Sequence, residues 1–210
     1  MAKETIITKL EKGRAEFAYK CVKECVVNLK PFELNTKKFL ENAVKEIKEN
    51  IFKKMEKELK EKKITDEKIE NLLSSPFEYT HKEKYQNLSI EEKKVIDFYK
   101  SLVKNYHSYV KKIPALILSN GLGQALAFVK AKSEKGNAYD LIYKQLTEYM
   151  KSEYTTRIQM PHDNELQDNE LIDWIISCDS STYKYITQEI LALLNWLKRF
   201  AEGLIKEEEE

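Results

Sequence analysis

Lysine and arginine side chains stand beside aromatic ones at several places in this chain, and that combination could bind nucleic acid. Cationic side chains hold phosphates, and aromatic rings stack on bases. Read singly, each residue is more typical of a solvated or snorkelling side chain. Taken together, they make a nucleic-acid interface a working hypothesis. The candidate binding residues are Arg14, Lys111, Lys112, Lys130, Lys132, Lys198 and Arg199, near Tyr106, Tyr109, Phe128 and Trp196.

Two cysteines, Cys21 and Cys25, lie one helical turn apart and could in principle share a metal ion. A zinc site needs about four ligands. The other cysteine and the histidines show no paired spacing; they are Cys178, His81, His107 and His162. We therefore interpret Cys21 and Cys25 as buried thiols that act as small hydrophobic side chains, and we expect no metal site and no cofactor.

The glycine-containing stretch SNGLGQ (119–124) lacks the pattern of a phosphate-binding loop. A P-loop requires GxxxxGK(S/T) after a strand and a Rossmann turn requires GxGxxG. Gly121 and Gly123 satisfy neither, and are better explained by a bend or by close helix packing. The chain also has no nucleophile elbow and no HExxH motif. We expect no catalytic residues and no enzymatic activity.

Composition favours an all-α protein. Five glycines and four prolines in 210 residues are few, whereas β-rich proteins need turn residues about every eight to twelve positions. The formal net charge is +1, so electrostatic binding must come from local patches. The N-terminus lacks the apolar region of a signal peptide, and no run reaches the roughly 18 apolar residues of a membrane helix. We expect a cytoplasmic protein without membrane contact.

Hydrophobic spacing of three and four residues predicts a single compact domain, 1–210, built as a bundle of about six to eight helices. The final helix has the clearest pattern, with Ile186, Ile190, Leu193, Leu197, Phe200 and Leu204 in one seam. The apolar stretch 111–132 is predicted to follow a break at Pro114, to fill the centre of the bundle and to bend near Asn120–Gly123. The predicted helices are 4–30, 36–63, 65–73, 89–112, 137–153, 169–178 and 181–206, with a loop at 74–87 and a polar connector at 155–171.

Three stretches in a fixed order resemble a known family. They are RAEFAY (14–19), YVKKIPALILSNGLGQALAFVKAK (109–132) and YKYITQEILALLNWLKRFAEGLI (183–205). Together they resemble the small helical subunit of the Cmr complex, the type III-B CRISPR RNA-guided effector. The resemblance covers about half of the chain directly. The departure is 31–95, a lysine- and glutamate-rich segment that we interpret as a helical insertion.

The resemblance implies a non-catalytic subunit, several copies of which stack into an inner filament beside the guide-bearing backbone subunits. Its partners would be those subunits, neighbouring small subunits and the guide–target RNA duplex. Base pairing reads the sequence in RNA-guided effectors while protein contacts the backbone, which suits scattered lysine and arginine. The isolated chain is expected to be monomeric. The alternative is a helical protein–protein assembly factor that does not touch nucleic acid.

Overall fold

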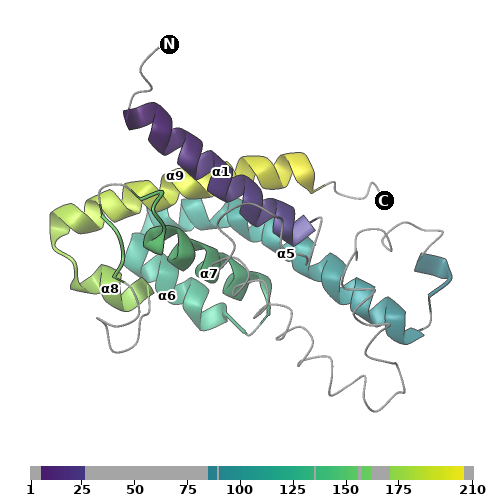
Figure 1. Ribbon diagram of the computed structural model, residues 1–210. Coiled ribbons are helices and arrows are strands. Elements are labelled where there is room, and N and C mark those ends of the chain that lie inside the picture. The colour runs from purple at the N-terminus through teal and green to yellow at the C-terminus, as the bar shows by residue number, and fades with distance from the viewer. Residues whose placement is uncertain are drawn as a thin grey trace, which may run out of the picture.

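The computed structural model describes residues 6–26, 85–88, 90–134, 136–155, 158–161 and 171–205. Within these residues the structure is all-α, with no strand, which confirms the predicted fold class. The helices are α1 (Ile6–Val26), α5 (Ile90–Asn120), α6 (Leu122–Lys132), α7 (Ala138–Lys151), α8 (Leu171–Ser177) and α9 (Ser180–Leu204) (Figure 1). The predicted helices 36–63 and 65–73 lie outside the described residues. So does most of the proposed insertion 31–95, of which only 85–88 and 90–95 are described.

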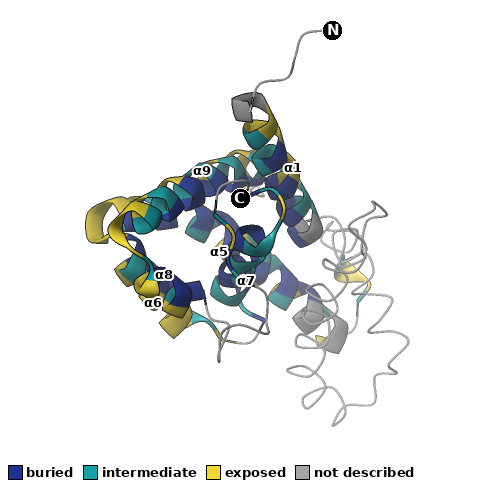
Figure 2. Cartoon of the chain, turned by 60° about the vertical axis from the view of Figure 1, so that its left-hand side comes forward, coloured by how far each residue is buried: buried dark blue, intermediate teal, exposed yellow. Residues whose placement is uncertain are grey.

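The helices pack around α9 and α5, the two longest partners in the core. α9 runs antiparallel to α5, and α1 packs on α9 (Figure 1). On the other side, α6 and α7 pack against α5 and against each other, while short α8 contacts α6 and α9. Their buried faces point inward between α9, α5 and α7 (Figure 2). This arrangement brings α1, from one end of the sequence, beside the C-terminal helix.

The predicted seam of α9 forms the centre of the core for four of its six residues. Ile186, Ile190, Leu193 and Leu197 are fully buried. Phe200 and Leu204 are half-buried and pack against the edge of the core, so the seam continues through the last two turns of the helix with less burial. Those turns carry part of the surface described below.

Two features were predicted for the apolar stretch 111–132, a helix break at Pro114 and a bend near Asn120–Gly123. The structure shows only the second. We expected a helix to end at about residue 112 because proline removes a backbone donor. Instead, α5 continues through Pro114 to Asn120. The chain breaks at Gly121, which has φ 84° and ψ 160°, a conformation open essentially only to glycine. The bend predicted at Asn120–Gly123 is therefore confirmed, but the break at Pro114 is wrong.

Hydrogen bonds on both sides hold the break at Gly121 together. The Gly121 N–H donates to the Ile117 carbonyl (2.8 Å), and the Ala125 N–H donates to the Gly121 carbonyl (3.1 Å). The Gly123 N–H, at the start of α6, donates to the Tyr183 hydroxyl of α9 (2.9 Å). The end of α5, the start of α6 and the start of α9 therefore meet at one end of the bundle.

Local signals begin the remaining long helices. The Asn137 side chain accepts from the Asp140 N–H (2.9 Å) at the start of α7. The Asp179 carboxylate accepts from the Ser181 and Thr182 N–H groups at the start of α9. Such caps satisfy backbone donors that have no partner within the helix. The predicted helices 137–153, 169–178 and 181–206 are confirmed as α7, α8 and α9.

The described core also contains polar groups and thiols. Cys21 and Cys25 are buried, as predicted. Tyr106, counted above among the aromatic residues near the basic ones, is fully buried, and its hydroxyl donates to Gln145 (2.9 Å). Tyr106 is therefore a core residue. None of the helices in the described ranges is long and apolar enough to cross a membrane.

Candidate nucleic-acid interface

The seven basic residues singled out from the sequence lie at three places in the structure. Arg14 lies between α1 and α9, in a largely buried polar network. Lys198 and Arg199 lie on the second half of α9. The others lie near a group of aromatic rings on α5, α6 and α7: Lys111, Lys112, Lys130 and Lys132. The structure therefore does not bring all seven together, and each group has different surroundings.

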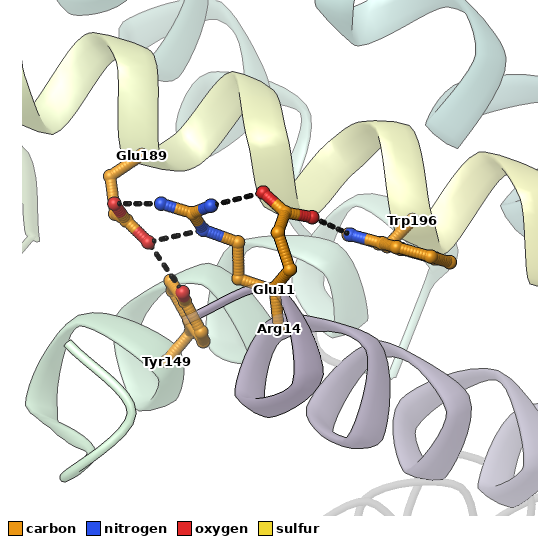
Figure 3. A network of polar contacts seen from close by, with 5 residues as sticks. All are labelled: Glu11, Arg14, Tyr149, Glu189 and Trp196. Atoms are coloured by element: carbon orange, nitrogen blue, oxygen red, sulfur yellow. Dashed lines mark hydrogen bonds and ion pairs between the residues drawn. The ribbon is translucent and has the colours of Figure 1, made fainter. Parts of the chain in front are cut away.

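Arg14 is committed to contacts inside the molecule (Figure 3). Its Nε donates to Glu189 Oε1 (2.8 Å) and its Nη2 to Glu189 Oε2 (2.7 Å). The Tyr149 hydroxyl, from α7, donates to the same carboxylate (2.6 Å). The Arg14 side chain is 13% exposed and that of Glu189 only 2%. A paired charge this deeply buried ties three helices together, and it has little surface left for an external phosphate.

The same network extends to the surface through Glu11. Arg14 Nη1 also donates to Glu11 Oε1 (2.5 Å). The second oxygen of Glu11 accepts from the Trp196 indole N–H (3.0 Å). The Glu11 side chain is 47% exposed. Glu11 therefore links the buried Arg14–Glu189 pair to the surface and helps to orient the Trp196 ring.

The directions of the pKa shifts within the network favour the charged forms of both Arg14 and Glu189. The hydrogen bond to Glu189 is the main reason that the pKa of Arg14 is raised further above its ordinary value. Burial alone would raise the pKa of Glu189, but hydrogen bonds from Arg14 and Tyr149 outweigh it, so that pKa lies below its ordinary value. Burial, and then the hydrogen bond to Glu189, raise the pKa of Tyr149. Tyr149 therefore stays a neutral donor to a charged carboxylate.

A group of aromatic rings joins α5, α6 and α7. Tyr109 and Tyr139 are stacked, with centroids 3.9 Å apart and planes at 12°. Phe128 meets Tyr139 edge-on at 5.9 Å and is 43% exposed. Lys112 and Lys132 are both exposed. They follow Tyr109 and Phe128 by three and four residues, the spacing that places side chains on one helix face. We call Tyr109, Phe128, Tyr139, Lys112 and Lys132 the lysine–aromatic patch.

The neighbouring lysines point elsewhere. Residues adjacent in a helix are about 100° apart around its axis, so Lys111 projects from a different side of α5 than Lys112. Lys130 lies over the ring of Tyr143, with its Nζ 4.9 Å from the centroid. Asp140, next to Tyr139, pairs with Lys144 (3.3 Å) and accepts from the Gly136 N–H. The acidic group nearest the stack in sequence is therefore already engaged.

Another aromatic group lies between α1 and α9. Trp196 and Phe200 stack with centroids 5.7 Å apart, and Tyr19 meets Phe200 edge-on at 5.4 Å. The Arg199 guanidinium lies 5.4 Å from the Trp196 ring centroid, and Lys23 Nζ lies 5.7 Å from that of Tyr19. We call these five residues the α1–α9 aromatic cluster. Lys198, beside it in sequence, is half-buried.

Three residues of these contact groups were not singled out from the sequence. Tyr139 was assigned to an amphipathic helix without any role, and Glu189 and Tyr149 were not considered. For Glu189 a signal existed, because it lies one turn from Ile186 and Leu193 within the seam of α9. A carboxylate in an apolar stripe indicates a buried partner. Within the described residues, no group of three or more His, Cys, Asp or Glu side chains is placed to hold a metal ion.

Comparison with known proteins assigns the family. The family model described as CRISPR-associated protein (Cas_Cmr5) matches residues 84–204, more than half of the chain. The chain belongs to the Cmr5 family. A similar relative is the CRISPR system Cmr subunit Cmr5 of Thermus thermophilus. It is 31% identical over 109 residues, which cover 49% of this chain and 76% of the relative. The resemblance noted in the sequence is thereby confirmed.

The matched region has a clear place in the fold. The Cmr5 match runs from just before α5 to the end of α9 and contains every residue of the lysine–aromatic patch. Helix α1 lies outside the match, yet it packs on α9 and supplies Arg14 to the buried network. α1 is therefore an integral part of the described bundle.

Proposed function

We propose that this chain is a small, non-catalytic subunit of a type III-B CRISPR ribonucleoprotein effector. In this proposal, copies of the chain stack as an inner filament beside the guide-bearing backbone subunits, in the cytoplasm. Membership of the Cmr5 family supports the assignment to such a complex. The proposal also holds that the chain contacts the backbone of the guide–target RNA.

The observation that carries the RNA contact is the lysine–aromatic patch. Lys112 and Lys132 are exposed on the same helix faces as Tyr109 and Phe128. Phe128, which meets the Tyr109–Tyr139 stack edge-on, is 43% exposed. Lysines can neutralise phosphates, and a partly exposed ring can pack on a sugar or a base. This combination has no need for base-specific contacts, as expected where base pairing reads the sequence.

The other basic candidates have secondary roles in this proposal. Lys111 and Lys130 flank the patch on other helix faces and would meet phosphates further along the duplex. Lys198 and Arg199 belong to a separate surface, where a neighbouring subunit is the better candidate. Arg14 is left out of the RNA contact because Glu189 and Glu11 occupy its guanidinium.

The test compares target-RNA binding by complexes assembled with natural or altered chains. The double change Lys112→Glu and Lys132→Glu should weaken binding at least tenfold at low salt. It should also reduce the slope of log affinity against log salt by about 1 per lysine lost from each bound copy. Filter binding or fluorescence anisotropy at several salt concentrations measures both quantities.

A matched control uses Lys9→Glu with Lys12→Glu, which changes the charge equally at exposed positions on α1, away from the helices of the patch. This control should leave affinity and slope close to those of the natural complex. Equal affinity for the patch variant and the natural complex would contradict the RNA contact. Combined with an absence of RNA crosslinks to this subunit, that result would favour an assembly factor that does not touch nucleic acid.

A further inference from the structure

The two aromatic groups described above differ in what covers their rings. In the α1–α9 aromatic cluster, Trp196 and Phe200 stack on each other, and the Arg199 guanidinium lies over the Trp196 ring. Tyr19 meets Phe200 edge-on and has the Lys23 ammonium over its ring. The rings of this cluster are therefore already engaged with neighbouring side chains.

The Phe128 ring of the lysine–aromatic patch is less covered. Its plane makes an angle of 87° with the plane of Tyr139, and the two centroids are 5.9 Å apart. Because the two rings are perpendicular, contact with Tyr139 covers at most one face of Phe128. The residue as a whole is 43% exposed. The Phe128 ring therefore keeps a face on which another flat group can stack.

The residues around Phe128 on α6 leave room beside this ring. Ala127 precedes it directly and Ala131 lies about one turn beyond it, and both are exposed. Since a methyl group projects less far from a helix than a phenyl ring, the two alanines do not shield Phe128. Lys132 is also exposed, four residues beyond Phe128 on the same helix face. A nucleotide needs this combination, a ring for its base and a cation for its phosphate.

The tyrosine stack beside Phe128 adds no negative charge to the patch. Burial, the neighbouring Tyr109 and a hydrogen bond with it raise the pKa of Tyr139 above its ordinary value of 10.0. The Tyr139 hydroxyl therefore stays protonated at neutral pH. A phosphate that approaches Lys132 meets no ionised phenol at Tyr139.

We infer that the lysine–aromatic patch binds an unpaired nucleotide of the target RNA, whose base stacks on Phe128 while Lys132 and Lys112 hold nearby phosphates. Within a continuous duplex, each base has another base on both faces and offers none to a protein ring. Bases that have left the stack are the ones that pack on aromatic side chains. The contact reads no sequence, because every base has a π-face.

This inference rests on the proposed function and narrows it. In the proposed function, the backbone subunits hold the guide, so the small subunit is assigned the target strand. The patch then contacts a target nucleotide that lies outside continuous pairing, in addition to the duplex backbone.

Photocrosslinking of the assembled complex tests the stacking directly. Each target RNA in a series carries one 5-iodouridine, a base that couples on irradiation to aromatic side chains packed against it. Trypsin releases residues 113–130, in which Phe128 is the sole aromatic residue. At one or more positions the adduct should lie on this peptide, and Phe128→Leu should abolish it. The lack of an adduct on this peptide at every position would overturn the inference.

Target-RNA affinity provides a second test. Phe128→Leu keeps an apolar side chain but removes the ring face. It should weaken target binding at least about fivefold, the low end of the loss expected for one stacked base. The slope of log affinity against log salt should not change, because no charge is lost. Phe128→Tyr keeps the ring and should bind like the natural chain. Equal affinities for Phe128→Leu and the natural complex would count against stacking.

Mismatches with the guide decide whether the stacked nucleotide is unpaired. At the target position that crosslinks to Phe128, a mismatch should leave the affinity unchanged, whereas mismatches at the adjacent positions should lower it. If a mismatch at the crosslinked position lowers the affinity as much as those beside it, that nucleotide is paired and the inference is wrong.

The same measurements separate this inference from the proposed function. If Lys112→Glu with Lys132→Glu weakens binding and reduces the salt slope, while Phe128→Leu changes neither and no adduct forms, only the stacking is wrong. The chain would then contact the backbone of a continuous duplex. If neither the lysine variant nor Phe128→Leu changes target binding, the proposed RNA contact fails as well.

Discussion

The network of Glu11, Arg14, Tyr149 and Glu189, here called the α1–α9 junction, and the lysine–aromatic patch contain similar residues in different surroundings. Each places cationic side chains near tyrosine. At the junction, the Arg14 side chain is 13% exposed and both oxygens of Glu189 accept from it. On the patch, Lys112 and Lys132 are exposed. A buried, paired cation is part of the fold, whereas an exposed cation remains available to a partner. The difference lies in burial, which composition alone does not reveal.

The largest expected effect comes from breaking the buried pair. Arg14→Met removes the cation and leaves the Glu189 carboxylate, 2% exposed, with Tyr149 as its remaining donor among the contacts described above. Leaving one partner of a buried ion pair unpaired costs about 3 to 5 kcal/mol. Urea denaturation of the isolated chain, followed by circular dichroism, measures the loss.

The control for Arg14→Met adds Glu189→Gln, which removes the stranded charge but keeps an acceptor for the Tyr149 hydroxyl. The double variant should recover a large part of the lost stability. If Arg14→Met alone changes the free energy of unfolding by less than about 0.5 kcal/mol, as surface substitutions do, the network does not anchor α1.

Acid should weaken the junction more than the patch. The folded-state pKa of Glu189 lies below its usual value of 4.5. Its pairing therefore contributes stability that is fully present above about pH 4.5 and is lost as pH falls through the folded-state pKa. Unfolding free energies measured from pH 7 to pH 3 should fall less steeply for the Arg14→Met, Glu189→Gln double variant. Parallel curves for the two chains would contradict this.

Two glycines provide a smaller test of which backbone positions the fold constrains. Gly121→Ala forces a side chain into φ 84°, ψ 160°, at a cost of about 1 to 3 kcal/mol. Gly203→Ala has open space around the new Cβ and should stabilise the isolated chain by up to about 1 kcal/mol, because alanine favours the helix. Thermal denaturation compares the two. If Gly203→Ala destabilised the isolated chain, packing within the chain itself would require a glycine at this position of α9.

The smallest effect is expected at the patch itself. Lys112→Glu with Lys132→Glu should change the free energy of unfolding by no more than about 0.5 kcal/mol, since both side chains are exposed. The same urea titration used for Arg14 provides the value. A loss comparable with that of Arg14→Met would mean that the lysines are structural, and the RNA result could not then be attributed to direct contact.

Much of the fold could be predicted from periodicity. The spacing of apolar residues identified α1, α7, α8 and α9, and the glycine pair located the bend at Gly121. The end of α5 could not be predicted in this way. Proline usually ends or kinks a helix, but Ile113 and Ile117 on either side of Pro114 are buried in the core. Tertiary packing of that face outweighs the local preference.

The candidate site could be predicted less well. Lysine beside tyrosine or phenylalanine in the sequence pointed to α5 and α6, which carry four of the five residues of the lysine–aromatic patch. The ring stack also needs Tyr139 from α7, which only the fold brings there. Arg14 was grouped with the exposed residues although it occupies a gap in the apolar stripe of α1, between Leu10 and Phe17. Its position within that stripe was the available sign of burial.

The anchoring of α1 also has a consequence for chain entropy. Contacts on α9 fix the position of α1, so both ends of the chain between Val26 and Ile90 are held in place. The entropy of loop closure grows only with the logarithm of length, and doubling the length costs about 0.6 kcal/mol. That amount is small beside the cost of breaking the Arg14–Glu189 pair. A change in the length of this segment should therefore cost this chain little stability compared with the loss of the contact between its first and last helices.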